Sequence, residues 1–106
     1  MLKVENMKSP ATGRKVANQF ILTDTENNRV TFQSYDSMIV EIDNNARVIT
    51  VGADWQYGPT TSKYRNEFMK NNLFQSIATT DQFAKALKEG KVETYGRVYK
   101  IVLLDE

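Results

Sequence analysis

Few side chains in this sequence can carry out chemistry. It contains no cysteine and no histidine, which excludes disulfides, thiolate nucleophiles and zinc sites built on these residues. The commonest general base is missing for the same reason. The five glycines do not have the spacing of a phosphate-binding or dinucleotide-binding loop, and no calcium-binding loop occurs. We therefore expect no cofactor and no metal ion.

The remaining chemical candidates are one carboxylate and one serine–lysine pair. Asp54 precedes Trp55 and lies near Tyr57, and a carboxyl group buried beside aromatic rings has a raised pKa. We favour a simpler interpretation, in which Asp54 belongs to a turn at the end of a strand. Ser62 and Lys63 are adjacent at a predicted helix start, where their side chains diverge. The sequence thus predicts a protein that is not an enzyme.

Binding is better supported than catalysis. Aromatic side chains and arginine are enriched at the centres of protein interfaces, and one short segment combines them with lysines. The predicted partner-binding residues are Trp55, Tyr57, Lys63, Arg65 and Lys70.

Two other interpretations of this segment remain open. Trp55, Tyr57 and Tyr64 could simply cover a sheet edge while the cations stay in solvent. The same aromatic and cationic residues could also stack bases and contact phosphates of single-stranded nucleic acid. Protein binding is favoured over nucleic acid, because the net charge is only +1 and there is no aromatic strand of the RNA-recognition type.

The elements that position this segment are predicted from periodicity and turn residues. Residues 15–52 alternate in hydrophobicity and contain polar turn clusters, which predicts an antiparallel meander. Within it, the segment Ser34–Asp43 fits either a strand or a short helix. Residues 1–14 are expected to be a flexible arm or a short edge strand.

Two helices are predicted after the meander. Thr60 or Thr61 can cap a helix beginning at Ser62 and ending at the asparagine pair 71–72, with Tyr64, Phe68 and Met69 toward the core. Thr79 and Gln82 have capping-box spacing for a second helix that ends at Gly90. A last strand follows, in which Gly96 is expected to mark a bulge.

These elements predict a single α+β domain over residues 1–106, with an antiparallel sheet of about five strands and two helices packed on one face. An open sheet edge could pair in a homodimer. No apolar run approaches the length of a membrane helix and no signal-peptide pattern is seen. We therefore expect no membrane association and a cytoplasmic location.

Charge is distributed unevenly along the chain, which predicts an acidic hairpin followed by a basic helix–strand edge. Residues 16–45 contain five acidic residues and a single arginine, namely Asp24, Glu26, Asp36, Glu41, Asp43 and Arg29. Residues 84–100 have the opposite balance, with Lys85, Lys88, Lys91, Arg97 and Lys100 against Glu89 and Glu93. Ordinary solvated faces are the simpler interpretation of both blocks.

Three motifs follow one another along the chain: an N-Q-F strand, an F-Q-S-Y segment, and an aromatic turn entering T-T-x-K-Y-R-N-x-F. Their positions are Asn18, Gln19, Phe20, Phe32, Gln33, Ser34, Tyr35, Thr60, Thr61, Lys63, Tyr64, Arg65, Asn66 and Phe68. Over roughly residues 9–70, this pattern resembles a group of small uncharacterised proteins encoded by phages and mobile elements of Gram-positive and gut bacteria.

The resemblance implies a genomic setting and no specific activity. Small accessory proteins of phages often bind a host protein or ribonucleoprotein, including as inhibitors of CRISPR nucleases or other defences, and this step is an association from context. We accordingly expect a non-enzymatic accessory protein that acts on a host macromolecule in the bacterial cytoplasm. A small nucleic-acid-binding module and an oligomerising domain are the alternatives.

Overall fold

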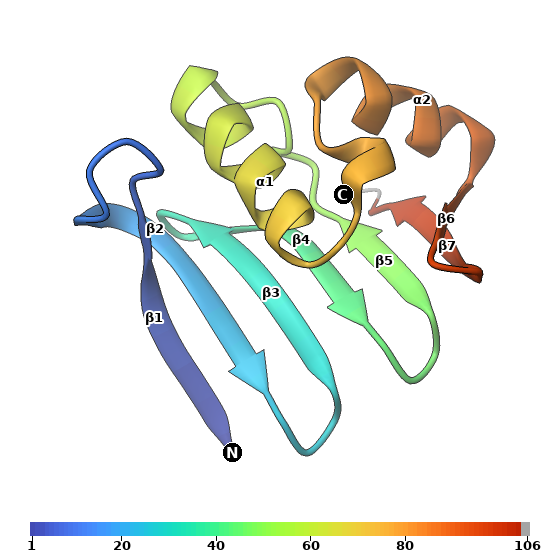
Figure 1. Ribbon diagram of the computed structural model, residues 1–106, viewed down its shortest axis with the longest axis horizontal. Coiled ribbons are helices and arrows are strands. Elements are labelled where there is room, and N and C mark those ends of the chain that lie inside the picture. The colour runs from blue at the N-terminus through green and yellow to red at the C-terminus, as the bar shows by residue number, and fades with distance from the viewer. Residues whose placement is uncertain (105–106) are drawn as a thin grey trace.

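The computed structural model describes residues 1–104 as one open sheet covered on one face by helices (Figure 1). The strands are β1 (Leu2–Lys8), β2 (Lys15–Asp24), β3 (Arg29–Ser34), β4 (Ser37–Asp43), β5 (Val48–Val51), β6 (Lys91–Thr94) and β7 (Arg97–Leu103). The helices are α1 (Pro59–Asn71), the 3-10 helix η1 (Gln75–Ile77) and α2 (Thr80–Glu89).

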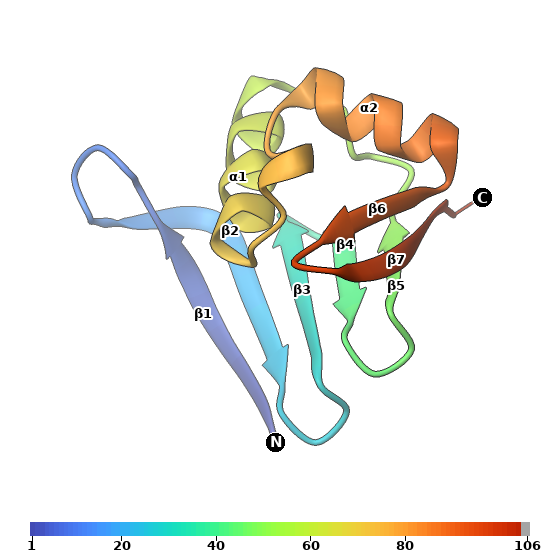
Figure 2. The same cartoon turned by 45° about the vertical axis from the view of Figure 1, so that its right-hand side comes forward.

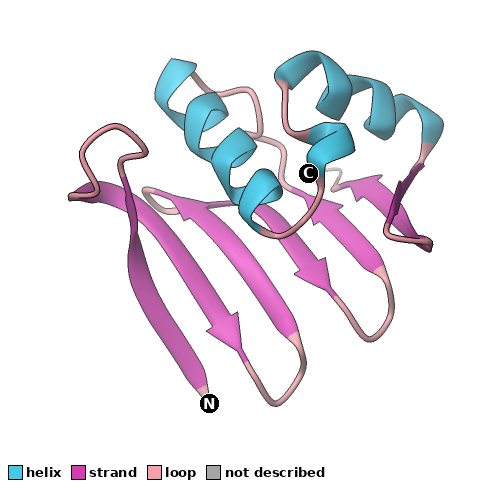
Figure 3. Ribbon diagram, in the orientation of Figure 1, coloured by secondary structure: helices cyan, strands magenta, loops and turns pink. Residues whose placement is uncertain are grey.

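The sheet has seven strands in the order β1-β2-β3-β4-β5-β7-β6. Neighbouring strands are antiparallel except β5 and β7, which are parallel and bring Val48 beside Lys100. The predicted α+β class and the two helices on one face are confirmed, as Figure 3 makes visible.

The two strands beyond the expected number have separate causes. Residues 2–8 form the edge strand β1 and pair with β2, so the edge-strand alternative for the N-terminal segment holds. At the other end of the sheet, Tyr95 and Gly96 both have positive φ angles, of 47° and 77°. Paired positive φ angles are typical of the type I′ turn of a hairpin. The expectation of one bulged strand around Gly96 is therefore wrong, and β6 and β7 form a hairpin.

The ambiguous segment after β3 is a strand. Tyr35, at a φ of 53°, turns the chain, and β4 then pairs with β3 so that Ser37 lies opposite Ser34. Tyr35 is 56% exposed at this turn. A large side chain at positive φ is uncommon because its Cβ crowds the backbone.

Helix α1 starts earlier than predicted. Pro59 occupies its first turn, and Gly58 is the N-cap residue without a side-chain hydrogen bond. A proline fits there because its fixed φ angle suits the first helical turn and the missing N–H has no partner in any case. The prediction that Thr60 or Thr61 caps the helix is wrong, and Thr61 is a buried residue of the helix itself.

Helix α2 has the predicted ends. Thr79 Oγ1 accepts a hydrogen bond from the Gln82 N–H, and Gln82 Oε1 accepts one from the Thr79 N–H, at 3.2 Å each. Gly90 ends the helix in the left-handed conformation. Figure 2 shows α2 lying above the β6–β7 hairpin.

The core lies between the sheet and the helices. Phe32 of β3 stacks on Phe68 of α1, with ring centroids 5.9 Å apart. Phe74, just after α1, meets Tyr99 of β7 edge to face at 5.0 Å. Tyr64, Phe68 and Met69 are all buried, which confirms the predicted apolar side of α1.

A prediction follows from Gly52, which leads out of β5. Its N–H donates to the Ile39 carbonyl oxygen at 2.8 Å, and a Cβ atom placed on Gly52 would overlap the carbonyl oxygen of Met38. Gly52→Ala should therefore lower the free energy of unfolding by about 1–3 kcal/mol, the usual cost of overpacking. Urea denaturation measures this difference.

Gly58→Ala is the matched control, because a Cβ atom there meets nothing within 4 Å and its φ angle of 179° suits any residue. We expect it to change stability by less than about 1 kcal/mol. Equal effects of the two variants would contradict the packing argument.

Candidate functional site

The segment between β5 and α1 is a compact turn. The Trp55 N–H donates to the Gly52 carbonyl oxygen at 3.2 Å, and the Tyr57 N–H donates to the Asp54 carbonyl oxygen at 3.0 Å. Asp54 thus belongs to a turn at the end of a strand, as the simpler interpretation expected. Helix α1 begins at Pro59, directly after this segment.

Arg65 fixes this segment to both helices. From α1, its Nη1 donates to the Trp55 carbonyl oxygen at 2.7 Å, and its Nη2 donates to Thr80 Oγ1 of α2 at 2.8 Å. Asn66 Oδ1 accepts from Nη2 at 2.9 Å. The guanidinium carbon also lies 5.2 Å from the Trp55 ring centroid and 4.7 Å from that of Phe83. One side chain therefore joins the loop, α1 and α2.

Arg65 is fully buried, with an exposed fraction of 0%, and forms no ion pair within residues 1–104. Burial lowers its pKa to about 10, because the charged form loses solvation. The guanidinium remains charged at neutral pH. The prediction that Arg65 belongs to an exposed contact surface is wrong, since a partner could not reach this side chain.

The other predicted contact residues divide between interior and surface. Trp55 is half-buried and packs on Phe83 with centroids 5.3 Å apart. Tyr57 is exposed, as are Lys63 and Lys70 on α1. The Lys63 ammonium lies 5.4 Å from the ring centroid of Tyr64. Only Tyr57, Lys63 and Lys70 thus remain freely accessible.

Tyr57 lines a pocket of about 450 Å³ between this turn and the β3–β4 turn. The pocket, called here the acidic tyrosine pocket, combines two carboxylates, two tyrosines and three hydroxyl groups. Its lining residues are Ser34, Tyr35, Asp36, Ser37, Ile39, Asp54, Tyr57 and Thr61.

Two hydrogen bonds connect the walls of the acidic tyrosine pocket. Ser37 Oγ donates to Asp54 Oδ2 at 3.0 Å, which links the start of β4 to the segment before α1. Deeper inside, Ser34 Oγ and Thr61 Oγ1 share a hydrogen bond of 3.0 Å. Hydrogen bonds between segments distant in sequence therefore hold the walls of the pocket together.

Sequence reasoning missed most of this pocket. Ser34 and Tyr35 belong to the F-Q-S-Y motif and Asp36 to the acidic block, but the sequence does not place them beside Asp54, because their approach to Asp54 depends on the pairing of β4 with β5. The available signal was the polar run S-Y-D-S, which provides hydroxyl groups, an aromatic ring and a carboxylate at one turn.

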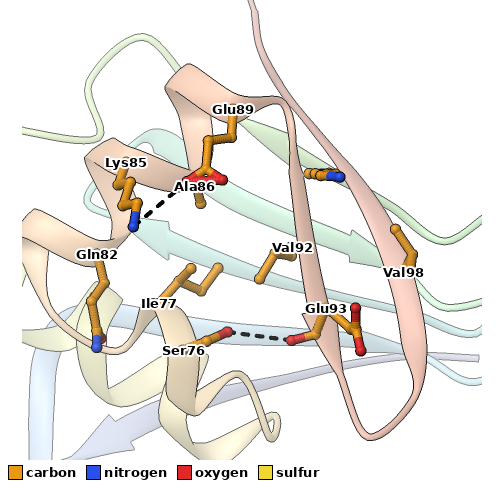
Figure 4. Close-up of a pocket in the computed structure, with 10 residues that line it drawn as sticks. Ser76, Ile77, Gln82, Lys85, Ala86, Glu89, Val92, Glu93 and Val98 are labelled. Carbon is orange, nitrogen blue, oxygen red and sulfur yellow. Dashed lines mark hydrogen bonds and ion pairs between the residues drawn. The ribbon is translucent and has the colours of Figure 1, made fainter.

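A second pocket lies under α2 and carries mixed charge (Figure 4). Lys85 and Glu89 form an ion pair at 3.9 Å along the helix, and Ser76 Oγ donates to the Glu93 carbonyl oxygen at 3.4 Å. It contains none of the predicted contact residues. Because lysines and glutamates alternate around it, this pocket selects for neither sign of charge.

The basic residues near the C-terminus are spread over several elements. Lys85 and Lys88 lie on α2, while Lys91 and Lys100 are direct cross-strand neighbours in the β6–β7 hairpin. In the acidic block, Asp43 Oδ2 accepts from Arg29 Nε at 3.1 Å. Hydrogen bonds from the backbone N–H of Ala46 and then of Asn45 hold the pKa of Asp43 below its usual value. Part of the acidic block therefore stabilises turns.

Among the described residues, no helix is both long and apolar enough to cross a membrane. The same residues contain no cluster of three or more potential metal ligands from histidine, cysteine, aspartate and glutamate.

The chain belongs to a protein family described as a family of unknown function (DUF8033), whose family model matches residues 2–85. The match includes β1, the acidic tyrosine pocket, Arg65 and Phe83, and it extends beyond the resemblance noted over residues 9–70. The β6–β7 hairpin lies outside it. No curated protein and no solved structure matches the chain.

Substitution of Arg65 tests whether its side chain stabilises the packing of the β5–α1 turn, α1 and α2. Arg65→Ala removes contacts with two aromatic rings, deprives the Trp55 carbonyl group of its donor and leaves a cavity. It should lower the free energy of unfolding by about 3 kcal/mol, measured by urea denaturation. Arg65→Lys should also destabilise the protein, because an ammonium lacks the planar fork of donors.

Lys63→Ala, on the exposed side of the same helix, is the control and should cost less than about 1 kcal/mol. If Arg65→Ala were no more destabilising than Lys63→Ala, the guanidinium would not be a structural centre.

Proposed function

We propose that this family member is a non-enzymatic accessory protein of phages or mobile elements that binds a host protein in the bacterial cytoplasm. We further propose that it acts as an anti-defence inhibitor of the anti-CRISPR type. The genomic setting rests on the resemblance of the N-Q-F, F-Q-S-Y and T-T-x-K-Y-R-N-x-F motifs. The absence of histidine and cysteine narrows the chemistry open to an enzyme and so favours a binding role.

The observation that carries the binding proposal is that Tyr57 has an exposed side chain on a backbone held in place by neighbouring contacts. Its side chain is 76% exposed, yet its backbone belongs to the turn that Arg65 fastens at the neighbouring Trp55 carbonyl group. A large amphipathic side chain on a fixed backbone loses little conformational freedom on binding. Such tyrosines are frequent anchors of protein interfaces.

Charge favours a protein partner over nucleic acid. Burial of Arg65 removes the only arginine from the predicted contact set, and the remaining cations are Lys63 and Lys70. Asp36 and Asp54 line the adjoining pocket, where they would repel a phosphate backbone. One observation supports the alternative of an oligomerising domain. Within residues 1–104, β1 and β6 are the edge strands of the sheet, and an open edge can pair with a strand of another chain.

A pull-down with a matched pair of tyrosine variants tests the proposal. The immobilised protein should capture a host protein from bacterial lysate, and Tyr57→Ala should reduce its recovery at least about tenfold, as expected for an interface anchor. Tyr95→Ala is the control. Tyr95 is similarly exposed, at 77%, but lies in the β6–β7 turn at the other end of the sheet.

Three results would contradict the proposal. One is the absence of any captured protein together with no effect on phage plating against defence-carrying hosts. Another is equal capture by wild type, Tyr57→Ala and Tyr95→Ala. The third is a complex with DNA or RNA that weakens steeply with salt, which would favour the nucleic-acid alternative.

A further inference from the structure

We propose that the acidic tyrosine pocket receives an arginine side chain of the protein partner. This inference rests on the proposed function and extends it by naming the chemistry that the partner presents. It is carried by the charge of the pocket, its aromatic walls and its unused hydrogen-bonding groups.

The pocket carries negative charge that no cationic side chain among its lining residues neutralises. Asp36 and Asp54 line it, and no lysine or arginine does. Neither carboxylate forms an ion pair with any residue in the described range 1–104. Ser37 occupies Oδ2 of Asp54, whereas the Asp36 carboxylate accepts no hydrogen bond from these residues. A cation entering the pocket would therefore meet two available carboxylates.

The walls suit a flat cation on an aliphatic stem. Tyr35 and Tyr57 line the pocket and are 56% and 76% exposed, so a ligand can reach both side chains. A guanidinium stacks on aromatic faces and pairs with carboxylates through a planar fork of donors. Ile39, buried to 1% exposure, contributes an apolar surface for the methylene groups of an arginine.

The inner end of the pocket has hydrogen-bonding capacity that the protein does not use. Ser34 and Thr61 are 4% and 3% exposed, and their hydroxyl groups share one hydrogen bond. Each oxygen keeps a lone pair that can accept from a guanidinium.

A metal ion fits the pocket less well than a guanidinium. Calcium requires six or more oxygen ligands, several of them usually carboxylates, and the described residues contain no cluster of three acidic or other typical ligands. The exposed tyrosine rings would also contribute nothing to such an ion.

The test is a titration of the ¹⁵N-labelled protein, residues 1–106, followed by NMR. The probe is acetyl-Gly-Arg-Gly-amide, and the control probe replaces arginine by citrulline, which has the same shape without the charge. The arginine peptide should shift the amide signals of Tyr35, Asp36, Ser37, Asp54 and Tyr57, and added salt should weaken its binding. The citrulline peptide should leave these signals unchanged.

Paired charge variants identify the carboxylates. Asp36→Asn combined with Asp54→Asn should weaken arginine binding at least about tenfold, since both carboxylates attract the guanidinium. Glu5→Gln combined with Glu26→Gln changes the net charge equally on exposed side chains outside the pocket and should leave binding unaffected. If the first double variant fails to fold, Asp36→Asn alone replaces it, because Asp36 is exposed.

Two outcomes would overturn this inference: equal shifts with arginine and citrulline, or arginine shifts spread evenly over acidic residues outside the pocket. The proposed function fails separately. Loss of partner capture in Tyr57→Ala without any arginine response would contradict only the pocket assignment. An arginine response without any captured host protein would contradict only the proposed function.

Discussion

The structure depends most on a buried cation that has no anionic partner within residues 1–104. Removing a guanidinium from water is costly, and Arg65 recovers this cost through three neutral hydrogen-bond acceptors and two aromatic rings. Each desolvated contact between a cation and an aromatic ring contributes about 2 kcal/mol. Because the acceptors belong to the β5–α1 turn, α1 and α2, the arrangement of these three segments is set together.

This constraint links the interior to the candidate surface. Trp55 faces inward over Phe83, while Tyr57, two residues later, is exposed and lines the acidic tyrosine pocket. The same turn also places Asp54 where Ser37, the first residue of β4, can donate to it. Disturbing Arg65 should therefore alter the pocket even though the guanidinium is not among its lining residues.

The features that were predictable depend on neighbours in sequence. The capping box of Thr79 and Gln82 involves only four consecutive residues. Its hydrogen bonds are local, so the short sequence favours the helix start without help from the rest of the fold. The apolar side of α1 follows similarly from helical spacing. Arg65 was placed wrongly because an arginine among polar helix residues usually faces solvent, and its burial depends on Phe83 and Thr80 in another helix. The pocket also depends on long-range pairing, which single-sequence patterns do not encode.

The parallel pairing of β5 with β7 has a consequence for synthesis on the ribosome. β5 is made early, but the strand that covers its free edge is separated from it by both helices. A nascent chain that has emerged only as far as α2 would expose the backbone N–H and C=O groups on the β7 side of β5, where another extended peptide can pair with them. Closing this edge requires a contact between residues about fifty positions apart, and such contacts form slowly. Until β7 emerges, this edge of the nascent chain is therefore open to aggregation or chaperone capture.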